Sequence, residues 1–121
     1  MPPPVKVLVA ARDAGLRPNF HGDELSPELK SGLLAAEVGA VAMSHCEETD
    51  EAGVDAMARA GVVAVLLPTT QQILKLKDPP ARRFIEKSVP VALATDFNPN
   101  CHVLSMPLVM WQACTSWRQW G

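Results

Sequence analysis

The feature that most constrains the fold of this chain is a set of short apolar runs in which apolar and polar residues do not alternate. The runs are AVAMSH at residues 40–45, VVAVLL at 62–67 and VPVALAT at 89–95. Strands that are apolar on both sides are typical of parallel sheets whose faces are covered. We therefore expect these three runs to be neighbouring parallel strands of an α/β fold.

Helical patterns separate the apolar runs, and a fourth, shorter strand is predicted at residues 17–21. Ser26 is the expected N-cap of the second helix, with Pro27 in its first position. Thr49 or Asp50 is expected to cap the third. Helices are predicted at about residues 5–15, 27–38, 50–60, 80–87 and 106–117, and a helical turn or irregular loop at 71–77. The alternation predicts one domain over residues 1–121 with about four parallel strands.

The composition excludes several classes of function. The net charge is -2 and the basic residues form no long run, which argues against a nucleic-acid partner. No apolar stretch approaches the roughly 20 residues that cross a bilayer, so we expect no membrane association. The three cysteines show no CxxC spacing, which favours reduced thiols in a cytoplasmic protein over a disulfide framework.

Polar residues fall where the predicted strands end. The four ends are His21, His45, Pro68 and Asp96, at intervals of 23 to 28 residues, which is about one strand-helix repeat. Parallel α/β folds bind their ligands at the carboxyl ends of the strands. Three of the four strands therefore end in a side chain that is able to bind a metal ion.

Each of these residues also has a purely structural interpretation. Glu24 would be favoured by the dipole of the following helix, His45 would be a buried imidazole beside a solvated loop, and DFNPN at residues 96–100 would be a turn. Together they favour a mononuclear metal site, because neutral imidazoles and carboxylates bind divalent cations. His21 and Asp96 supply two ligands, whereas a catalytic site usually has about three.

Several motifs resemble one known family. NFHGDEL, AMSHCEETDEAG, VVAVLLPTT, VALATDFNPN and SMPLVMWQAC are similar to segments of imidazolonepropionase, a metal-dependent amidohydrolase of histidine degradation. The resemblance extends from about residue 9 to residue 114. It implies a (β/α)8, or TIM, barrel, of which this chain would be a fragment: a partial barrel domain that corresponds to strands 5–8.

The resemblance also implies roles for individual residues. His21 and Asp96 would hold the divalent metal ion, zinc or iron. Asp96, His45 and Glu24 would be catalytic: Asp96 takes a proton, His45 polarises the substrate and Glu24 contacts the ring nitrogens. Glu24, His45 and Asn98 would bind the substrate. The implied reaction is hydrolytic opening of the ring of 4-imidazolone-5-propanoate to N-formimidoyl-L-glutamate.

The sequence departs from the family pattern in ways that bear on activity. It contains no HxH pair, which supplies two further metal ligands in the family, and it contains no tyrosine. Asn100 and Cys101 stand where bacterial members more often have Gly followed by Ser or Thr, and the tail TSWRQWG departs from the family. We therefore expect the chain alone to turn over little or no substrate.

Two alternatives from other classes stay open. A half-barrel has two unpaired sheet edges and an uncovered apolar face, which favours self-association into a homo-oligomer or pairing with a missing half. Trp111, Trp117 and Trp120 would then lie in a core or an interface. A complete, doubly wound binding domain would instead need a glycine-rich phosphate loop after the first strand, and the sequence has none.

Overall fold

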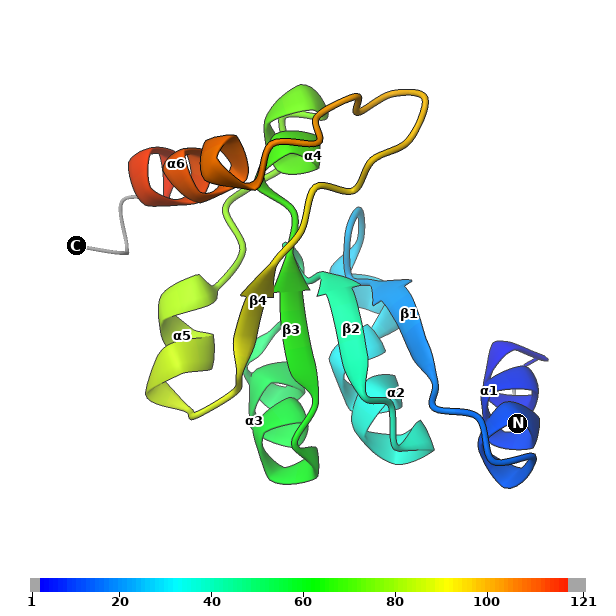
Figure 1. Cartoon of the computed structure of the whole chain (residues 1–121). Helices are drawn as coiled ribbons and strands as arrows, with labels where there is room; N and C mark the ends of the chain where they lie inside the picture. Colours follow the sequence, from blue (N-terminus) through cyan, green and yellow to red (C-terminus); the bar gives the residue numbers. More distant parts are fainter. Residues whose placement is uncertain (1–2, 118–121) are drawn as a thin grey trace.

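The computed structural model describes residues 3–117 and contains one four-stranded sheet. The strands are β1 (Asn19–Gly22), β2 (Ala42–His45), β3 (Val63–Leu66) and β4 (Val91–Leu93). All neighbouring strands are parallel, and their order in the sheet is their order in the chain (Figure 1). The predicted set of four parallel strands is therefore correct, and the predicted boundaries differ from the observed ones by at most two residues.

Helices surround the sheet at three places. In Figure 1, α2 and α3 lie behind the sheet, α5 and α1 lie beside its β4 and β1 edges, and α4 and α6 lie beyond the tips of the strand arrows. Within residues 3–117, no helix is both long and apolar enough to cross a membrane. The helices are α1 (Pro3–Asp13), the 3-10 turn η1 (Pro27–Leu29), α2 (Ser31–Val38), α3 (Glu51–Ala60), α4 (Pro68–Ile73), α5 (Ala81–Glu86) and α6 (Met106–Ser116).

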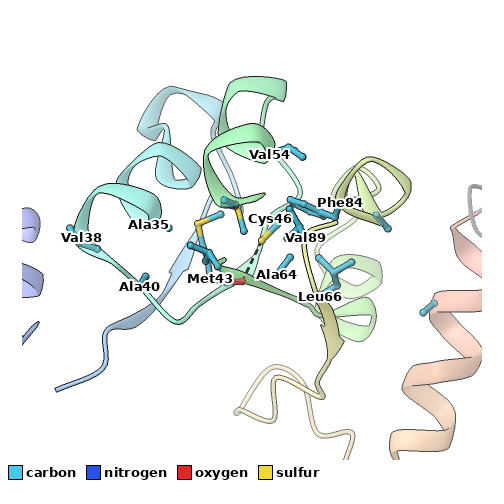
Figure 2. Close-up of a cluster of buried hydrophobic side chains, with 14 of the residues drawn as sticks. Ala35, Val38, Ala40, Met43, Cys46, Val54, Ala64, Leu66, Phe84 and Val89 are labelled. Carbon is cyan, nitrogen blue, oxygen red and sulfur yellow. Dashed lines mark hydrogen bonds between the residues drawn. The ribbon is translucent and has the colours of Figure 1, made fainter. Parts of the chain in front are cut away.

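The hydrophobic core lies between the sheet and the helices behind it. Met43 and Ala64 are paired in register on the core-facing side, and Phe84 of α5 packs into the same cluster (Figure 2). On the opposite side, Ser44 and Val65 form another register pair and are only partly buried. The sequence predicted a sheet with both faces covered. Among the described residues, helices cover only the face that carries Met43 and Ala64.

The predicted single helix at residues 27–38 is wrong: the structure divides it into η1 and α2. Ser26 is the N-cap, as predicted, and its Oγ accepts a hydrogen bond from the Glu28 N–H at 3.2 Å. Lys30 then adopts a left-handed conformation with φ of 50°, which ends the first turn. The Asp23 carboxylate accepts hydrogen bonds from the Ser31 and Gly32 N–H groups and so caps α2 from outside it. The helix propensities of the residues in α2 cannot reveal that its cap is Asp23, which lies eight residues before Ser31 in the chain.

The helix after β3 also begins earlier than predicted. Pro68 occupies the start of α4, where a missing N–H costs nothing, so the helix spans Pro68–Ile73 rather than residues 71–77. A chain of side-chain hydrogen bonds joins α4 to α6: Thr69 Oγ1 donates to Gln112 Oε1 at 2.6 Å, and Gln112 Nε2 donates to Gln72 Oε1 at 3.2 Å. These bonds fix α6 above the carboxyl ends of the strands.

The tryptophans of the C-terminal region have different surroundings. Trp117 is buried in the core cluster, which agrees with the prediction of a core position rather than an interface position. Trp111 on α6 is 62% exposed and Met110 beside it is also exposed. Trp120 lies outside the described residues.

Replacing Asp50 by alanine is expected to destabilise the protein by about 1 kcal/mol, the usual contribution of an N-cap. Asp50 caps α3, and its Oδ1 accepts a hydrogen bond from the Gly53 N–H at 2.8 Å. Urea unfolding followed by circular dichroism measures the loss. Asp55→Ala is the matched control, since it removes only an exposed ion pair with Lys87 and should cost clearly less. Equal effects of the two substitutions would contradict the capping role.

Candidate metal and active site

The structure brings three of the predicted site residues together at the carboxyl edge of the sheet. His21 ends β1, His45 ends β2, and Asp96 follows β4. Each offers one ligand atom such that all three atoms lie within 4.8 Å of one another. Glu24 and Asn98 line the same cavity, which has a volume of about 390 Å³. All five residues singled out from the sequence therefore meet at one place.

The two histidine rings are in direct contact. His21 Nδ1 and His45 Nε2 form a 2.7 Å hydrogen bond, and the ring centroids are 4.7 Å apart. Strict alternation would place them on opposite sides of the sheet, because His21 is in register with Ser44, the residue before His45. His45, however, has a φ of 79°. This left-handed conformation rotates its Cβ about the N–Cα bond and ends the alternation.

The environment of His45 keeps its imidazole neutral. Burial lowers the pKa of His45, the neighbouring His21 lowers it further, and the negative charges of Glu24 and Asp96 oppose these effects in part. The Nδ1 atom of His45 is buried and makes no hydrogen bond within the described part of the chain, and the nearest Glu24 oxygen is 3.7 Å away. A neutral ring has one acceptor nitrogen and one N–H donor to offer.

Asp96 is held from two directions. Its Oδ2 accepts a 2.5 Å hydrogen bond from Thr70 Oγ1, and its backbone carbonyl accepts one from Asn98 Nδ2 at 2.7 Å. Its φ of 52° is in the left-handed region, which a non-glycine residue adopts at a cost. Such strain is maintained where the surroundings over-determine the conformation, as the two hydrogen bonds do here.

The segment after Asp96 is the turn that its composition predicts. Asn98 Oδ1 accepts a hydrogen bond from the Asn100 N–H at 2.8 Å, and the backbones of Asn98 and Cys101 form an antiparallel bridge. Cys101 is buried, and its Sγ donates to the carbonyl of Thr95. Both polar atoms of the Asn98 amide are thus engaged with the loop backbone, which fixes the rim of the cavity.

These donors fit a divalent cation by their chemistry. A neutral imidazole nitrogen and a carboxylate oxygen are the ligand types that zinc and similar ions select. The His21–His45 hydrogen bond uses one nitrogen of each ring; in a neutral pair, the ring that donates the bond keeps a lone pair on its second nitrogen, and the ring that accepts it carries N–H there. Among residues 3–117, His21, His45 and Asp96 form the cluster with suitable spacing.

Two neighbouring residues do not belong to the reactive surface. Asp23 is 2% exposed, and its carboxylate is engaged with the N-terminus of α2 and with Thr49 Oγ1. Cys46 is buried in the core, its Sγ donates to the carbonyl of Met43 (Figure 2), and burial raises the pKa of its thiol. A thiol that stays protonated is a poor nucleophile.

Glu47 is a buried acid without a hydrogen-bonding partner in the described residues. Its side chain is 1% exposed, and both carboxylate oxygens lack a partner there. Burial, followed by the charges of Glu24, Asp96 and Glu48, raises the pKa of Glu47 from an ordinary value of 4.5 to about 8. Sequence analysis did not single out this residue, since HCEETD reads as an ordinary solvated loop.

The stability of the protein is expected to decrease between pH 4.5 and pH 8 because of Glu47. In this range the folded state binds a proton at Glu47 that the unfolded state has released, so raising the pH favours unfolding, by a few kcal/mol in total. Urea unfolding at a series of pH values should show a flatter profile for Glu47→Gln. Glu48→Gln is the control, because Glu48 is partly exposed and pairs with Lys77 at 2.7 Å. Parallel profiles for wild type and Glu47→Gln would contradict the raised pKa.

Several curated proteins are similar to this chain in sequence, and those described here are all named probable imidazolonepropionase. A probable imidazolonepropionase of Nematostella vectensis is 57% identical over 108 residues, which are 89% of this chain and 25% of that protein. One from Dictyostelium discoideum is 60% identical over 105 residues, 87% of this chain and 24% of that protein. The one from Homo sapiens is 50% identical over 113 residues, 93% of this chain and 26% of that protein. The chain thus spans about a quarter of the length of these relatives. No protein-family model matches it.

The fold has a solved counterpart. Guanine deaminase from C. acetobutylicum, determined with bound guanine in its active site, matches 90% of this chain and 30% of its own chain with a TM-score of 0.75. At 21% identity this similarity concerns the fold alone. The prediction of an α/β, partial-barrel arrangement of parallel strands is confirmed. Over 87–93% of its length, the chain is similar in sequence to a segment, about a quarter of the whole, of proteins named probable imidazolonepropionase.

Proposed function

We propose that residues 1–121 form a single partial-barrel domain that carries one wall of an imidazolonepropionase-type hydrolase site. The reaction would open the ring of 4-imidazolone-5-propanoate at a C–N bond and yield N-formimidoyl-L-glutamate. The observation that supports this most is the meeting of His21, His45 and Asp96 within 4.8 Å in a chain 50–60% identical to imidazolonepropionases.

We assign the metal-binding role to His21 and Asp96. A divalent cation, zinc or iron, would supply a Lewis acid and lower the pKa of a water molecule toward neutrality. We also assign the tautomers of the histidine pair: His21 Nδ1–H donates to His45 Nε2, which leaves His21 Nε2 as a ligand atom. The same arrangement makes His45 Nδ1–H the donor that has no partner within residues 3–117.

The remaining chemistry follows from these positions. His45 would polarise the ring carbonyl and stabilise the negative charge that develops on its oxygen when water adds. Asp96 would accept the proton of that water and return it to the departing ring nitrogen. Glu24, which is partly exposed at the cavity, would accept hydrogen bonds from the ring N–H groups. Asn98 shapes the rim that contacts the substrate.

The direct test is an assay of the purified chain with 4-imidazolone-5-propanoate, with and without zinc or iron. We expect little or no turnover, because the chain lacks the HxH pair of the family. We also expect the chain to bind one divalent cation per monomer, measured by metal analysis and titration calorimetry. Substantial turnover would contradict the expectation of an incomplete site, and absence of specific cation binding would contradict the proposed function.

A second candidate function, self-association of a non-catalytic half-barrel, is supported by the surface beside β1. An open groove of about 1050 Å³ lies between α1 and α2, with apolar side chains such as Val7, Leu29 and Leu33 in its lining. These three side chains are exposed. Sedimentation velocity at several concentrations tests this candidate: dimers would support it, and a monomer throughout the range would contradict it.

A further inference from the structure

Asp96 is held by a residue that neither the sequence motifs nor the family resemblance assigns to the site. Thr70, in α4, donates a hydrogen bond from its Oγ1 to Asp96 Oδ2 at 2.5 Å. The Thr70 side chain is buried, with 6% exposure, and both residues line the cavity that also contains His21 and His45. The bond therefore lies inside the candidate site.

This hydrogen bond restricts the orientation of the carboxylate. The last torsion of an aspartate side chain is broad, so an unsupported carboxylate samples many orientations. A hydroxyl bond to a charged oxygen is short and about twice as strong as one between neutral groups. With Oδ2 held by Thr70, the carboxylate is fixed in one orientation at the cavity that Asp96 lines. The backbone of Asp96 is in the left-handed region, which costs energy for a residue other than glycine. The hydrogen bond from Thr70 is therefore more important for holding Asp96 in place.

The donor itself is on a well-anchored element. The neighbour of Thr70, Thr69, is bonded to Gln112 of α6 at 2.6 Å. Gln71 on the other side donates to the carbonyl of Leu76 at 2.7 Å. The branched Cβ of threonine also limits its χ1 torsion. α4 thus divides its polar side chains between two tasks: Thr69 joins α6, and Thr70 faces Asp96.

We propose that Thr70 is a positioning residue that orients the Asp96 carboxylate for cation binding and for proton transfer. This inference rests on the proposed function of the site. Outer partners that orient a ligand commonly change metal affinity 10–100-fold when they are removed. Thr70 completes the pattern at the carboxyl edge of the sheet, since the helix that follows β3 now also contributes a polar group to the site.

The test is the affinity of the intact chain for Zn²⁺ alone, measured by titration calorimetry for wild type and four variants. Thr70→Val keeps the shape and removes the hydroxyl, and we expect its affinity to fall about 10–100-fold. Thr70→Ser keeps the hydroxyl and should stay within about threefold of wild type. Thr69→Val is the matched control: it should lower the melting temperature through the lost contact with α6 and leave affinity unchanged. Asp96→Asn should bind most weakly.

A second measurement separates orientation from folding. Bound Co²⁺ reports ligand geometry through its visible absorption, and Thr70→Val should change that spectrum whereas Thr69→Val should not. If Thr70→Val does not fold, as judged by circular dichroism, Thr70→Ala serves in its place. Wild-type affinity in a folded Thr70 variant, together with loss of binding in Asp96→Asn, would overturn the role of Thr70 alone. Unchanged binding in Asp96→Asn, or no binding by wild type, would overturn the proposed site itself.

Discussion

Replacing Asp23 by alanine is expected to lower the free energy of unfolding by about 3–5 kcal/mol, because it breaks three buried hydrogen bonds to one carboxylate. The Asp23 carboxylate accepts hydrogen bonds from Ser31 N–H at 2.8 Å, Gly32 N–H at 3.1 Å and Thr49 Oγ1 at 3.1 Å. Hydrogen bonds to a charged group contribute about 1.5–3 kcal/mol each, and the first two also place negative charge at the N-terminus of α2. The substitution would leave two N–H groups and a hydroxyl unsatisfied in the interior.

Denaturant unfolding, followed by circular dichroism, measures this loss. Asp23→Asn should give a smaller decrease, because its amide oxygen replaces one acceptor. The control is Glu24→Ala: Glu24 is the adjacent acid, it is partly exposed, and its removal should change stability by less than about 1 kcal/mol. If Asp23→Ala were no more destabilising than Glu24→Ala, the interpretation of Asp23 as a structural cap would be wrong.

Replacing His21 by alanine is expected to weaken Zn²⁺ binding by at least about 100-fold. Loss of a direct ligand should exceed the 10–100-fold effect that is typical of outer partners. Since β1 presents His21 at an exposed position, the substitution should leave the fold intact. Titration calorimetry measures the affinity, and circular dichroism checks the fold.

His102→Ala is the matched control for this prediction. His102 is also exposed, but its ring contacts Phe97 with centroids 5.7 Å apart and does not belong to the cluster of possible ligands. Its removal should leave Zn²⁺ affinity unchanged. Equal losses in the two variants would show that the cation binds histidines nonspecifically and would contradict the assignment of His21.

The strand ends show how far local sequence reasoning extends. A short run such as VVAVLL, rich in β-branched residues and bounded by Gly61 and Pro68, is typical of a buried strand, and parallel strands place their carboxyl ends on one edge. His21, His45 and Asp96 were therefore predictable as neighbours from their positions alone. The turn after Asp96 was predictable as well, since asparagine bonds to its own backbone two residues on, as Asn98 does with Asn100.

Other residues of the site gave no signal that could be interpreted alone. Asp23 stands between two candidate residues in FHGDEL and has the same chemical type as Glu24, yet one is buried and the other partly exposed. Thr70 lies in LLPTT, two residues after the predicted strand end at Pro68. That position was the only indication in the sequence that it could belong to the site. Glu47 lies two residues after His45 and is the more buried of two adjacent glutamates.

The sequence by itself determined the four-stranded parallel α/β arrangement and the edge at which His21, His45 and Asp96 meet. It did so because apolar runs and strand ends are properties of consecutive residues. Only the tertiary structure decided which acid caps a helix, that His45 turns toward His21, and that Thr70 holds Asp96. Those contacts join residues that are 8, 24 and 26 positions apart. They depend on backbone conformations and packing that no local pattern encodes.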